Sequence, residues 1–287
     1  MSSYPVWVDG VFAEPFSAVI AAEDPGFALG VAVFETILFE SGTPYFVAEH
    51  FARLERGARE LGIAWPPRHE PRAALAEYLA RLGPRDCAVR VTLTRGVAER
   101  GPTLVVVARE IVRVADPGAK VIVSRFTKLH DDPFERVKST NRLRNVLARE
   151  EANRLGAWDA LLPTEQGDLA EGTWCNLFAL SGGRLLTPAL DRGCLAGILR
   201  DQVLREVAAR PLAFPTVEAR IQPDDLRVAD EVFATNTTGR IVPIVEVLGV
   251  RTGLPGSAGP VVRELRARIA RIEARHRAEH RSVAPTP

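Results

Sequence analysis

The first 110 residues have a hydrophobic pattern that predicts a small sheet covered by helices. Short apolar or β-branched runs predict strands at residues 5–8, 18–21, 31–39, 87–93 and 104–108. Asp9-Gly10 is typical of a hairpin turn, placed here between the first two runs. Two segments with apolar residues every three or four positions predict helices at residues 47–62 and 71–82.

A turn at Asp116-Pro117-Gly118 separates this region from a longer one in which strands and helices mix. Strands are predicted at residues 120–126, 160–163, 176–180, 185–187, 231–235 and 241–247, with a hairpin running from 160–163 through Gly167 to 176–180. Helices are predicted at residues 144–155, 198–208, 223–228 and 261–280. The pattern indicates an α+β (mixed α/β) protein with a small domain at 1–115, a connection at 116–129 and a large domain at 130–287.

Composition narrows the class of protein. The chain has 287 residues, of which 46% are hydrophobic and 25% charged, as in ordinary globular proteins of about two domains. No apolar run reaches the roughly 18 residues of a membrane span, and the first residues lack the charged and apolar regions of a signal peptide. The net charge of +1 lacks the excess of basic residues that is typical of nucleic-acid-binding proteins. The three cysteines suggest neither disulfides nor a metal site. We expect a cytoplasmic enzyme or binding protein without membrane or nucleic-acid partners.

Lysine is scarce. Among 37 basic residues only Lys120, Lys128 and Lys138 are lysines, and the rest are arginines. A guanidinium stays protonated and is a poor nucleophile, whereas a desolvated amine can form a Schiff base. Lys138 lies between a predicted strand and a predicted helix, which makes it the candidate nucleophile. Alternatively, Lys138 has no catalytic role and is a lysine retained by chance in an arginine-rich chain.

Three later segments place polar groups where predicted elements begin or end. Glu171 stands at the entry of a predicted strand. The glycine turn 193–197 opens the helix of Ile198 and Leu199, whose N–H groups could bind an anion. The segment 235–239 offers threonine hydroxyls in a tight turn.

These segments, in this order over residues 5–250, resemble the fold-type IV pyridoxal-phosphate enzymes. That family includes branched-chain and D-amino-acid aminotransferases and 4-amino-4-deoxychorismate lyase. The matching motifs are Asp24-Pro25-Gly26-Phe27 with Val33-Phe34-Glu35-Thr36, His50-Phe51-Ala52-Arg53-Leu54, Lys138-Ser139-Thr140-Asn141, Glu171-Gly172-Thr173, Gly197-Ile198-Leu199-Arg200 and Thr235-Asn236-Thr237-Thr238. The resemblance implies a small α/β domain, a larger domain with a pseudo-barrel sheet, and a homodimer whose active sites lie at the subunit interface.

The resemblance also implies roles for individual residues. Lys138 would form the Schiff base with pyridoxal 5'-phosphate and move the proton between the substrate Cα and the cofactor C4′. Glu171 would pair with the protonated pyridine nitrogen. The phosphate group would be bound by Arg53, Ile198, Leu199, Thr237 and Thr238. Leu199 departs from the family, which often has a threonine there, and so removes one hydroxyl from the phosphate site.

The reaction stays open between two alternatives. Substrate-binding residues implied by the resemblance are Phe34, Arg90, Arg100 and Arg142. Arg90 resembles an arginine of branched-chain aminotransferases, and Arg100 one of D-amino-acid aminotransferases. The paired Arg-Gly sequences of the loop 95–101 and Asn141-Arg142-Leu143 are more similar to the lyase. We expect an aminotransferase that uses an amino acid and a 2-keto acid, with aminodeoxychorismate lyase, releasing pyruvate and p-aminobenzoate, as the alternative. A family member that has lost its cofactor is disfavoured, because Lys138 and Glu171 are both present.

Overall fold

The computed structural model describes residues 4–65 and 67–283. Residues 1 and 287, which bound the two expected domains, lie outside the described residues. Residues 1–3, at the start of the segment that lacks the features of a signal peptide, lie outside them too. Two compact units divide the chain: unit 1 comprises Met1–Val112, Val137–Asn141 and His276–Pro287, and unit 2 comprises Arg113–Arg136 and Arg142–Arg275. Unit 1 thus includes the segment of Lys138, which falls inside the range expected for the large domain.

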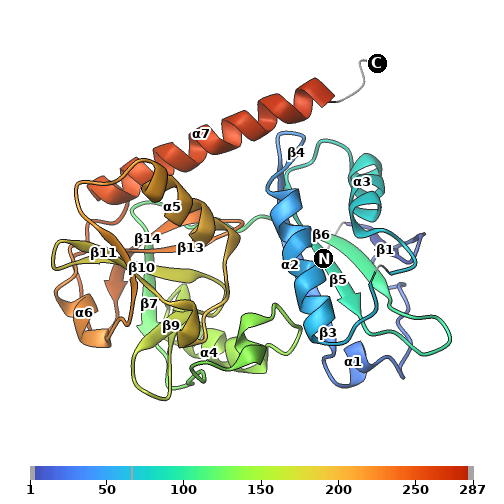
Figure 1. Cartoon of the computed structure of the whole chain (residues 1–287), viewed down its shortest axis with the longest axis horizontal. Coiled ribbons are helices and arrows are strands. Elements are labelled where there is room, and N and C mark those ends of the chain that lie inside the picture. The colour runs from blue at the N-terminus through green and yellow to red at the C-terminus, as the bar shows by residue number, and fades with distance from the viewer. Residues whose placement is uncertain (1–3, 66, 284–287) are drawn as a thin grey trace. The chain divides into compact units, whose positions relative to one another are not determined.

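Unit 1 is built on a six-stranded sheet in the order β2-β1-β6-β5-β3-β4. Figure 1 labels β1, β3, β4, β5 and β6 of this sheet. All of its strand pairs are antiparallel. The strands are β1 (Val6–Val8), β2 (Val11–Ala13), β3 (Ala32–Glu40), β4 (Thr43–Pro44), β5 (Cys87–Thr94) and β6 (Leu104–Arg109). Its helices are α1 (Pro25–Ala28), α2 (Val47–Glu60) and α3 (Pro71–Leu82).

The core of unit 1 lies between the sheet and the two longer helices. Phe51, Leu54 and Ala58 of α2 pack in one buried cluster with residues of α3 and of the central strands. Their spacing of three or four positions puts them on one helix face, which explains why the sequence pattern located this helix. Tyr78 of α3 is fully buried, and its hydroxyl donates to the Pro5 carbonyl and accepts from the Ala108 N–H.

Unit 2 contains an eight-stranded mixed sheet in the order β12-β11-β10-β13-β14-β7-β8-β9. Parallel pairs join β7 to β14 and β8, and β11 to β12, and the other pairs are antiparallel. The strands are β7 (Ala119–Val123), β8 (Asp159–Pro163), β9 (Leu169–Gly172), β10 (Asn176–Ser181), β11 (Arg184–Pro188), β12 (Thr216–Ala219), β13 (Glu231–Asn236) and β14 (Arg240–Val247). The helices are α4 (Leu143–Arg154), α5 (Ile198–Ala209), α6 (Pro223–Arg227) and α7 (Pro260–Val283), with 3-10 turns η1 (Pro133–Arg136), η2 (Leu190–Arg192) and η3 (Gly256–Ala258). The residues of α7 from His276 onward belong to unit 1.

The sheet of unit 2 curls until its two edges meet. The N–H of Leu169, on the edge strand β9, donates to the carbonyl of Ile221, just beyond the opposite edge strand β12, at 2.7 Å. Leu169 and Ile221 are fully buried, as are Leu177 and Ala234 of the central strands in the same cluster. Closing a sheet in this way protects its edges and encloses a core. The expected mixed α/β class with a pseudo-barrel sheet is confirmed.

Two details of the predicted strands are wrong. The turn at Asp9-Gly10 joins β1 to β2, whereas residues 18–21 form no strand and Val19 is 83% exposed. The hairpin that passes Gly167 leads from β8 to β9 rather than to 176–180. Strand β9 has the sequence Leu-Ala-Glu-Gly, without the β-branched or aromatic residues that signal a strand, so its pairing is imposed by the surrounding sheet.

No helix within residues 4–65 and 67–283 combines the length and the apolar character that crossing a bilayer would require.

Candidate active site

Lys138 is held in unit 1 by backbone pairing with the start of β3. Its carbonyl accepts from the Phe34 N–H at 3.0 Å, and the Thr140 N–H donates to the Ala32 carbonyl at 2.9 Å. The side chain of Val137, next to it, belongs to the buried core of unit 1. The backbone of Lys138 is therefore fixed although the residue lies outside any regular element.

The Phe34 ring brings two predicted site residues together in unit 1. The Lys138 Nζ lies 4.8 Å from the centre of this ring, and the Arg90 guanidinium carbon lies 3.7 Å from it. Arg90 is oriented further by a hydrogen bond from its Nε to the Thr92 hydroxyl at 3.1 Å. The Lys138 amine and the Arg90 guanidinium thus both contact the Phe34 ring, whose quadrupole attracts cations.

Arg53 belongs to a buried charged cluster in unit 1. Its Nε and Nη2 each lie 2.7 Å from one oxygen of Glu35, and the His50 Nδ1 lies 2.6 Å from Glu35 Oε2. Burial opposes ionisation of Glu35, but the charge and hydrogen bonds of Arg53 and His50 outweigh it and hold the pKa of this carboxyl well below its ordinary value. Burial also lowers the pKa of His50, against the opposing effect of Glu35, and the charges of Arg53 and Lys138 lower it further.

The three lysines have different surroundings. Lys120 is 54% exposed and pairs with Glu246 at 2.8 Å. Lys128 is fully buried, and its Nζ lies 2.6 Å from Glu171 Oε1 and 3.0 Å from Glu135 Oε2. The Lys128 amine is thus engaged in ion pairs with two carboxylates. Lys138, partly buried beside an aromatic ring, is the remaining candidate.

Glu171 is a buried carboxylate in unit 2, at the end of β9. Its Oε2 accepts from the Leu195 N–H at 2.9 Å and from the Asn176 side-chain amide at 3.4 Å, and its Oε1 accepts from Lys128. A carboxylate offers about four acceptor positions, so these three contacts leave room for one further donor. Glu171 is therefore placed to receive an N–H group of a bound molecule.

Helix α5 begins at Ile198 with backbone N–H groups that no side chain caps, because its N-cap residue is Gly197. A twelve-residue helix concentrates partial positive charge at this end. Ile198 and Leu199 are buried, so their side chains fix the helix while their N–H groups remain suited to an anion. The side chain of Leu199 adds no polar atom.

The turn that carries Thr237 and Thr238 joins β13 to β14. It is closed by Asn236, whose Oδ1 accepts from the Gly239 N–H at 2.6 Å and from the Thr238 hydroxyl at 3.3 Å. The preceding Thr235 hydroxyl is buried without a hydrogen-bond partner among the described residues. The turn thus has a defined shape and polar side chains, as the sequence suggested.

Two of the predicted substrate arginines occupy other settings. Arg100 is exposed in the loop 95–103, and its carbonyl accepts from Arg68 at 3.4 Å. Arg142 donates from Nη2 to the Thr173 carbonyl at 2.8 Å, and the Asn145 amide donates to the same oxygen. Arg142 therefore supports the segment that follows Glu171.

Sequence reasoning missed a polar centre beneath that segment. Asp159, fully buried, accepts from the Thr173 hydroxyl, from the Cys175 thiol at 3.2 Å and from the Ala160 N–H at 2.8 Å. Burial raises its pKa despite these contacts and the charge of Arg149, 3.4 Å away. A lone aspartate at a strand start carries no sequence signal for such a role, because its side-chain partners Thr173 and Cys175 are 14 and 16 positions away.

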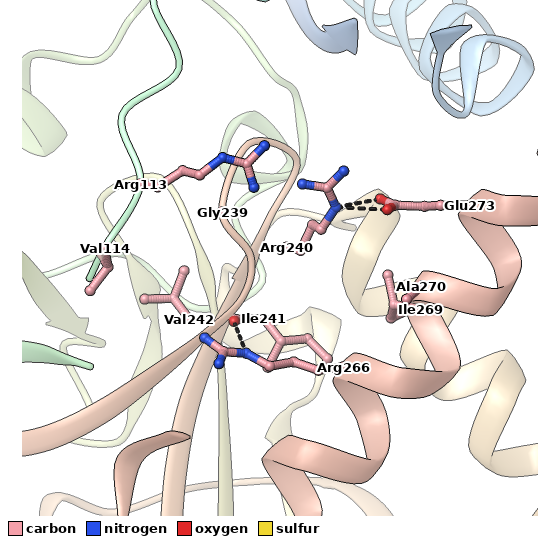
Figure 2. Close-up of a pocket in the computed structure, with 10 residues that line it drawn as sticks. All are labelled: Arg113, Val114, Gly239, Arg240, Ile241, Val242, Arg266, Ile269, Ala270 and Glu273. Atoms are coloured by element: carbon pink, nitrogen blue, oxygen red, sulfur yellow. Dashed lines mark hydrogen bonds and ion pairs between the residues drawn. The ribbon is translucent and has the colours of Figure 1, made fainter. Parts of the chain in front are cut away.

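A separate cavity of about 340 Å³ lies in unit 2 beside β14 and α7 (Figure 2). Three arginines and one glutamate line it. Figure 2 shows Arg240 facing Glu273, with Nε 2.6 and 2.8 Å from the two carboxylate oxygens, and Arg266 donating to the Ile241 carbonyl at 3.2 Å. None of the predicted site residues is among its lining residues.

The predicted site residues are divided between the two units. Unit 1 has the amine of Lys138 and the oriented guanidinium of Arg53. Unit 2 has the buried carboxylate of Glu171 and the uncapped start of α5.

Comparison with known proteins gives the family. The pattern of the amino-transferase class IV family matches residues 32–247, and the chain belongs to this family. Its members are enzymes that depend on pyridoxal phosphate. The family that the sequence motifs predicted is thereby confirmed.

Individual relatives have different activities. A provisionally named branched-chain-amino-acid aminotransferase of Methanocaldococcus jannaschii is 32% identical over 255 residues, covering 85% of this chain and 88% of that protein. An aminodeoxychorismate lyase of Bacillus subtilis is 28% identical over 261 residues, covering 86% and 88%. The crystal structure of the branched-chain amino acid aminotransferase of T.th. with pyridoxamine 5'-phosphate superimposes with a TM-score of 0.81 at 28% identity, covering 93% of each chain.

Proposed function

We propose that this enzyme moves an amino group between an amino acid and a 2-keto acid, using pyridoxal phosphate bound covalently to Lys138. The amino acid is of the branched-chain or D-amino-acid type. The relative of known structure that was crystallised with pyridoxamine phosphate supports the choice of cofactor.

One observation carries the proposal: Lys138 and Arg90 lie against the same Phe34 ring. A transaminating enzyme needs a base at the substrate Cα and a cation for a substrate carboxylate, and an amine and a guanidinium so close together supply both. Phe34 offers an apolar surface beside them, which suits an amino acid with an apolar side chain.

The residues of each unit fit the parts of the cofactor by their chemistry. When bound, the cofactor supplies an aldehyde that takes up an amine and a ring that accepts electrons. The Lys138 amine would hold the cofactor and, when free, would act as the base that takes the Cα proton. Glu171 has an acceptor position for the pyridine N–H.

The phosphate group requires donors, and five residues provide them in the proposal. The N–H groups at the start of α5 and the hydroxyls of the β13–β14 turn are neutral donors, and Arg53 adds a charge whose orientation Glu35 sets. We assign the phosphate to Arg53, Ile198, Leu199, Thr237 and Thr238. Substrate binding is assigned to Phe34, Arg90, Arg100 and Arg142, of which Arg142 acts through its hold on Thr173.

The test begins with the cofactor. Purified protein supplied with pyridoxal phosphate is reduced with borohydride, digested and analysed by mass spectrometry. We expect the adduct on Lys138, its loss in Lys138→Ala and its retention in Lys120→Ala, which changes a half-exposed lysine. An adduct on Lys120 or Lys128 would overturn the assignment.

The second step distinguishes the reactions. Mixed with L- or D-amino acids in the absence of a 2-keto acid, an aminotransferase converts its bound cofactor to pyridoxamine phosphate, which changes the absorbance spectrum. We expect this change with at least one amino acid and its reversal by a 2-keto acid.

Aminodeoxychorismate lyase is the second candidate, favoured by the Bacillus subtilis relative and by the loop that holds Arg100. A lyase returns the cofactor to Lys138 in each turnover and needs no second substrate. If no amino acid changes the spectrum while aminodeoxychorismate yields p-aminobenzoate and pyruvate, the aminotransferase proposal is wrong.

We also infer that the enzyme acts as a homodimer in the cytoplasm. The family resemblance supports the dimer, and the three free, buried cysteines suit a reducing compartment.

A further inference from the structure

Lys128 is a buried cation that the proposed reaction leaves without a role. Its side chain is fully buried in unit 2, where a lone ammonium would be strongly destabilising. Two carboxylates compensate it: Glu171 Oε1 at 2.6 Å and Glu135 Oε2 at 3.0 Å. Of these, Glu171 is the residue assigned to the pyridine nitrogen.

The position of Lys128 is fixed by its backbone. Its N–H donates to the Pro163 carbonyl at 2.8 Å, and its carbonyl accepts from the Glu165 N–H at 3.0 Å. The Lys128 backbone is therefore fixed beside the end of strand β8, and its side chain extends from there to Glu171.

The charges around Lys128 divide into two pairs. Glu135 also forms an ion pair with Arg144, so it keeps a cationic partner of its own. The other oxygen of Glu171 accepts from the Leu195 N–H and the Asn176 amide, which are neutral donors. Within the described part of unit 2, Lys128 is thus the positive charge that compensates Glu171.

We propose that Lys128 is a positioning residue that keeps Glu171 a carboxylate, so that the proton between Glu171 and the pyridine nitrogen resides on nitrogen. This inference rests on the proposed function. One proton is shared between the two groups, either as N–H⁺ facing O⁻ or as N facing H–O, and its transfer changes no other bond. Burial alone favours the uncharged arrangement, whereas an ammonium at 2.6 Å favours the charged one.

The consequence is chemical. A protonated pyridine ring withdraws electrons from the reacting carbon far better than a neutral ring does. Lys128 never touches the substrate or the cofactor in this proposal and acts only through Glu171. The near absence of lysine elsewhere is consistent with a compact ammonium being required at this buried position.

The test is nitrogen-15 NMR of holoenzyme loaded with pyridoxal phosphate labelled at the ring nitrogen. Lys128→Met removes the charge while keeping an unbranched apolar chain. Because the variant lacks the ammonium beside Glu171, we expect its ring nitrogen to shift from the protonated toward the unprotonated resonance. Lys120→Met, which removes a half-exposed lysine of the same unit, is the matched control and should keep the wild-type resonance.

The possible results distinguish a failure of the proposed function from a failure of the role assigned to Lys128. A wild-type protein that binds no labelled cofactor contradicts the proposed function. A folded Lys128→Met holoenzyme with the wild-type nitrogen resonance overturns the role of Lys128 alone, because a purely structural lysine would lower stability without moving the proton.

A double variant keeps the inference testable if Lys128→Met does not fold. Lys128→Met combined with Glu171→Gln removes one charge of each sign and leaves Glu135 with Arg144. The double variant should regain most of the melting temperature that Lys128→Met loses, on the order of 5–10 °C. A double variant no more stable than Lys128→Met would show that Lys128 does not act mainly on Glu171, and would overturn the proposal.

Discussion

Replacing Glu35 by glutamine tests the buried charged cluster of unit 1 directly. Glu35 is fully buried on β3, and both of its oxygens accept from Arg53 at 2.7 Å while one also contacts His50. Glu35→Gln keeps the size and shape of the side chain but removes the charge. The guanidinium of Arg53, which is only 8% exposed, then loses its compensating carboxylate.

The magnitude follows from the burial of both partners. Removing one member of a buried ion pair costs about 3–5 kcal/mol, because the remaining charge stays desolvated. The glutamine amide can still accept one hydrogen bond, and His50 can exchange tautomers to accept from its NH₂ group, which places the expected loss near the lower limit, at about 3 kcal/mol. Glu55→Gln on α2 is the matched control: Glu55 is 39% exposed and 3.6 Å from Arg59, so its loss should change stability by less than about 0.5 kcal/mol.

The difference between wild type and Glu35→Gln should depend on pH with a definite sign. The pKa of Glu35 is depressed in the folded protein, so the carboxylate contributes its full stability above the unfolded value of about 4.3. That contribution decreases as the pH falls below this value toward the folded pKa. The variant should therefore be much less stable than wild type at pH 7, and the gap should narrow at about pH 3.

Urea unfolding of cofactor-stripped protein, followed by circular dichroism at both pH values, measures these free energies. A Glu35→Gln protein whose urea midpoint at pH 7 equals that of wild type and of Glu55→Gln would refute the reasoning. It would mean that Arg53 finds solvent or another anion in place of Glu35.

Two further predictions concern reactivity and assembly. Burial raises the pKa of each cysteine thiol, to about 11 for Cys87 and about 12 for Cys194, so at pH 8 the thiolate fraction of Cys87 is only about one in a thousand. Iodoacetamide should therefore leave all three cysteines unlabelled in native protein and label all of them in urea, as measured by mass spectrometry; rapid labelling of any cysteine in native protein would contradict its burial. Light scattering coupled to size exclusion should give a mass of about twice 31.3 kDa at micromolar concentration, and a fully active monomer would refute the homodimer.

The sequence by itself determined the elements whose signals are local. The periodicity of α2 and the apolar runs of β3, β5 and β6 arise from residues within one or two turns or one strand of each other, and all four elements lie where the pattern predicted them. The predicted helix 71–82 coincides with α3, which starts with Pro71 at its first position and ends before Gly83, the usual boundary residues of a helix. The order of short motifs was likewise enough to identify the family, which the match over residues 32–247 confirms.

Sequence could not distinguish the lysines by their partners. Lys128 and Glu171 are 43 positions apart, and only the curled sheet of unit 2 brings the ammonium within 2.6 Å of the carboxylate. The same is true of Glu171 and the Leu195 N–H, 24 positions apart, and of β9, whose weak strand signal is overridden by the strands around it.

Tertiary structure also decided which unit holds the candidate nucleophile. The segment of Lys138 pairs with β3, about 100 positions earlier, so it joins unit 1 although its neighbours on both sides belong to unit 2. The physical reason is common to these cases. Hydrophobic periodicity reports which face of an element is buried, whereas the ionic and hydrogen-bond partners of a buried polar group depend on which distant segments the packed sheets bring beside it.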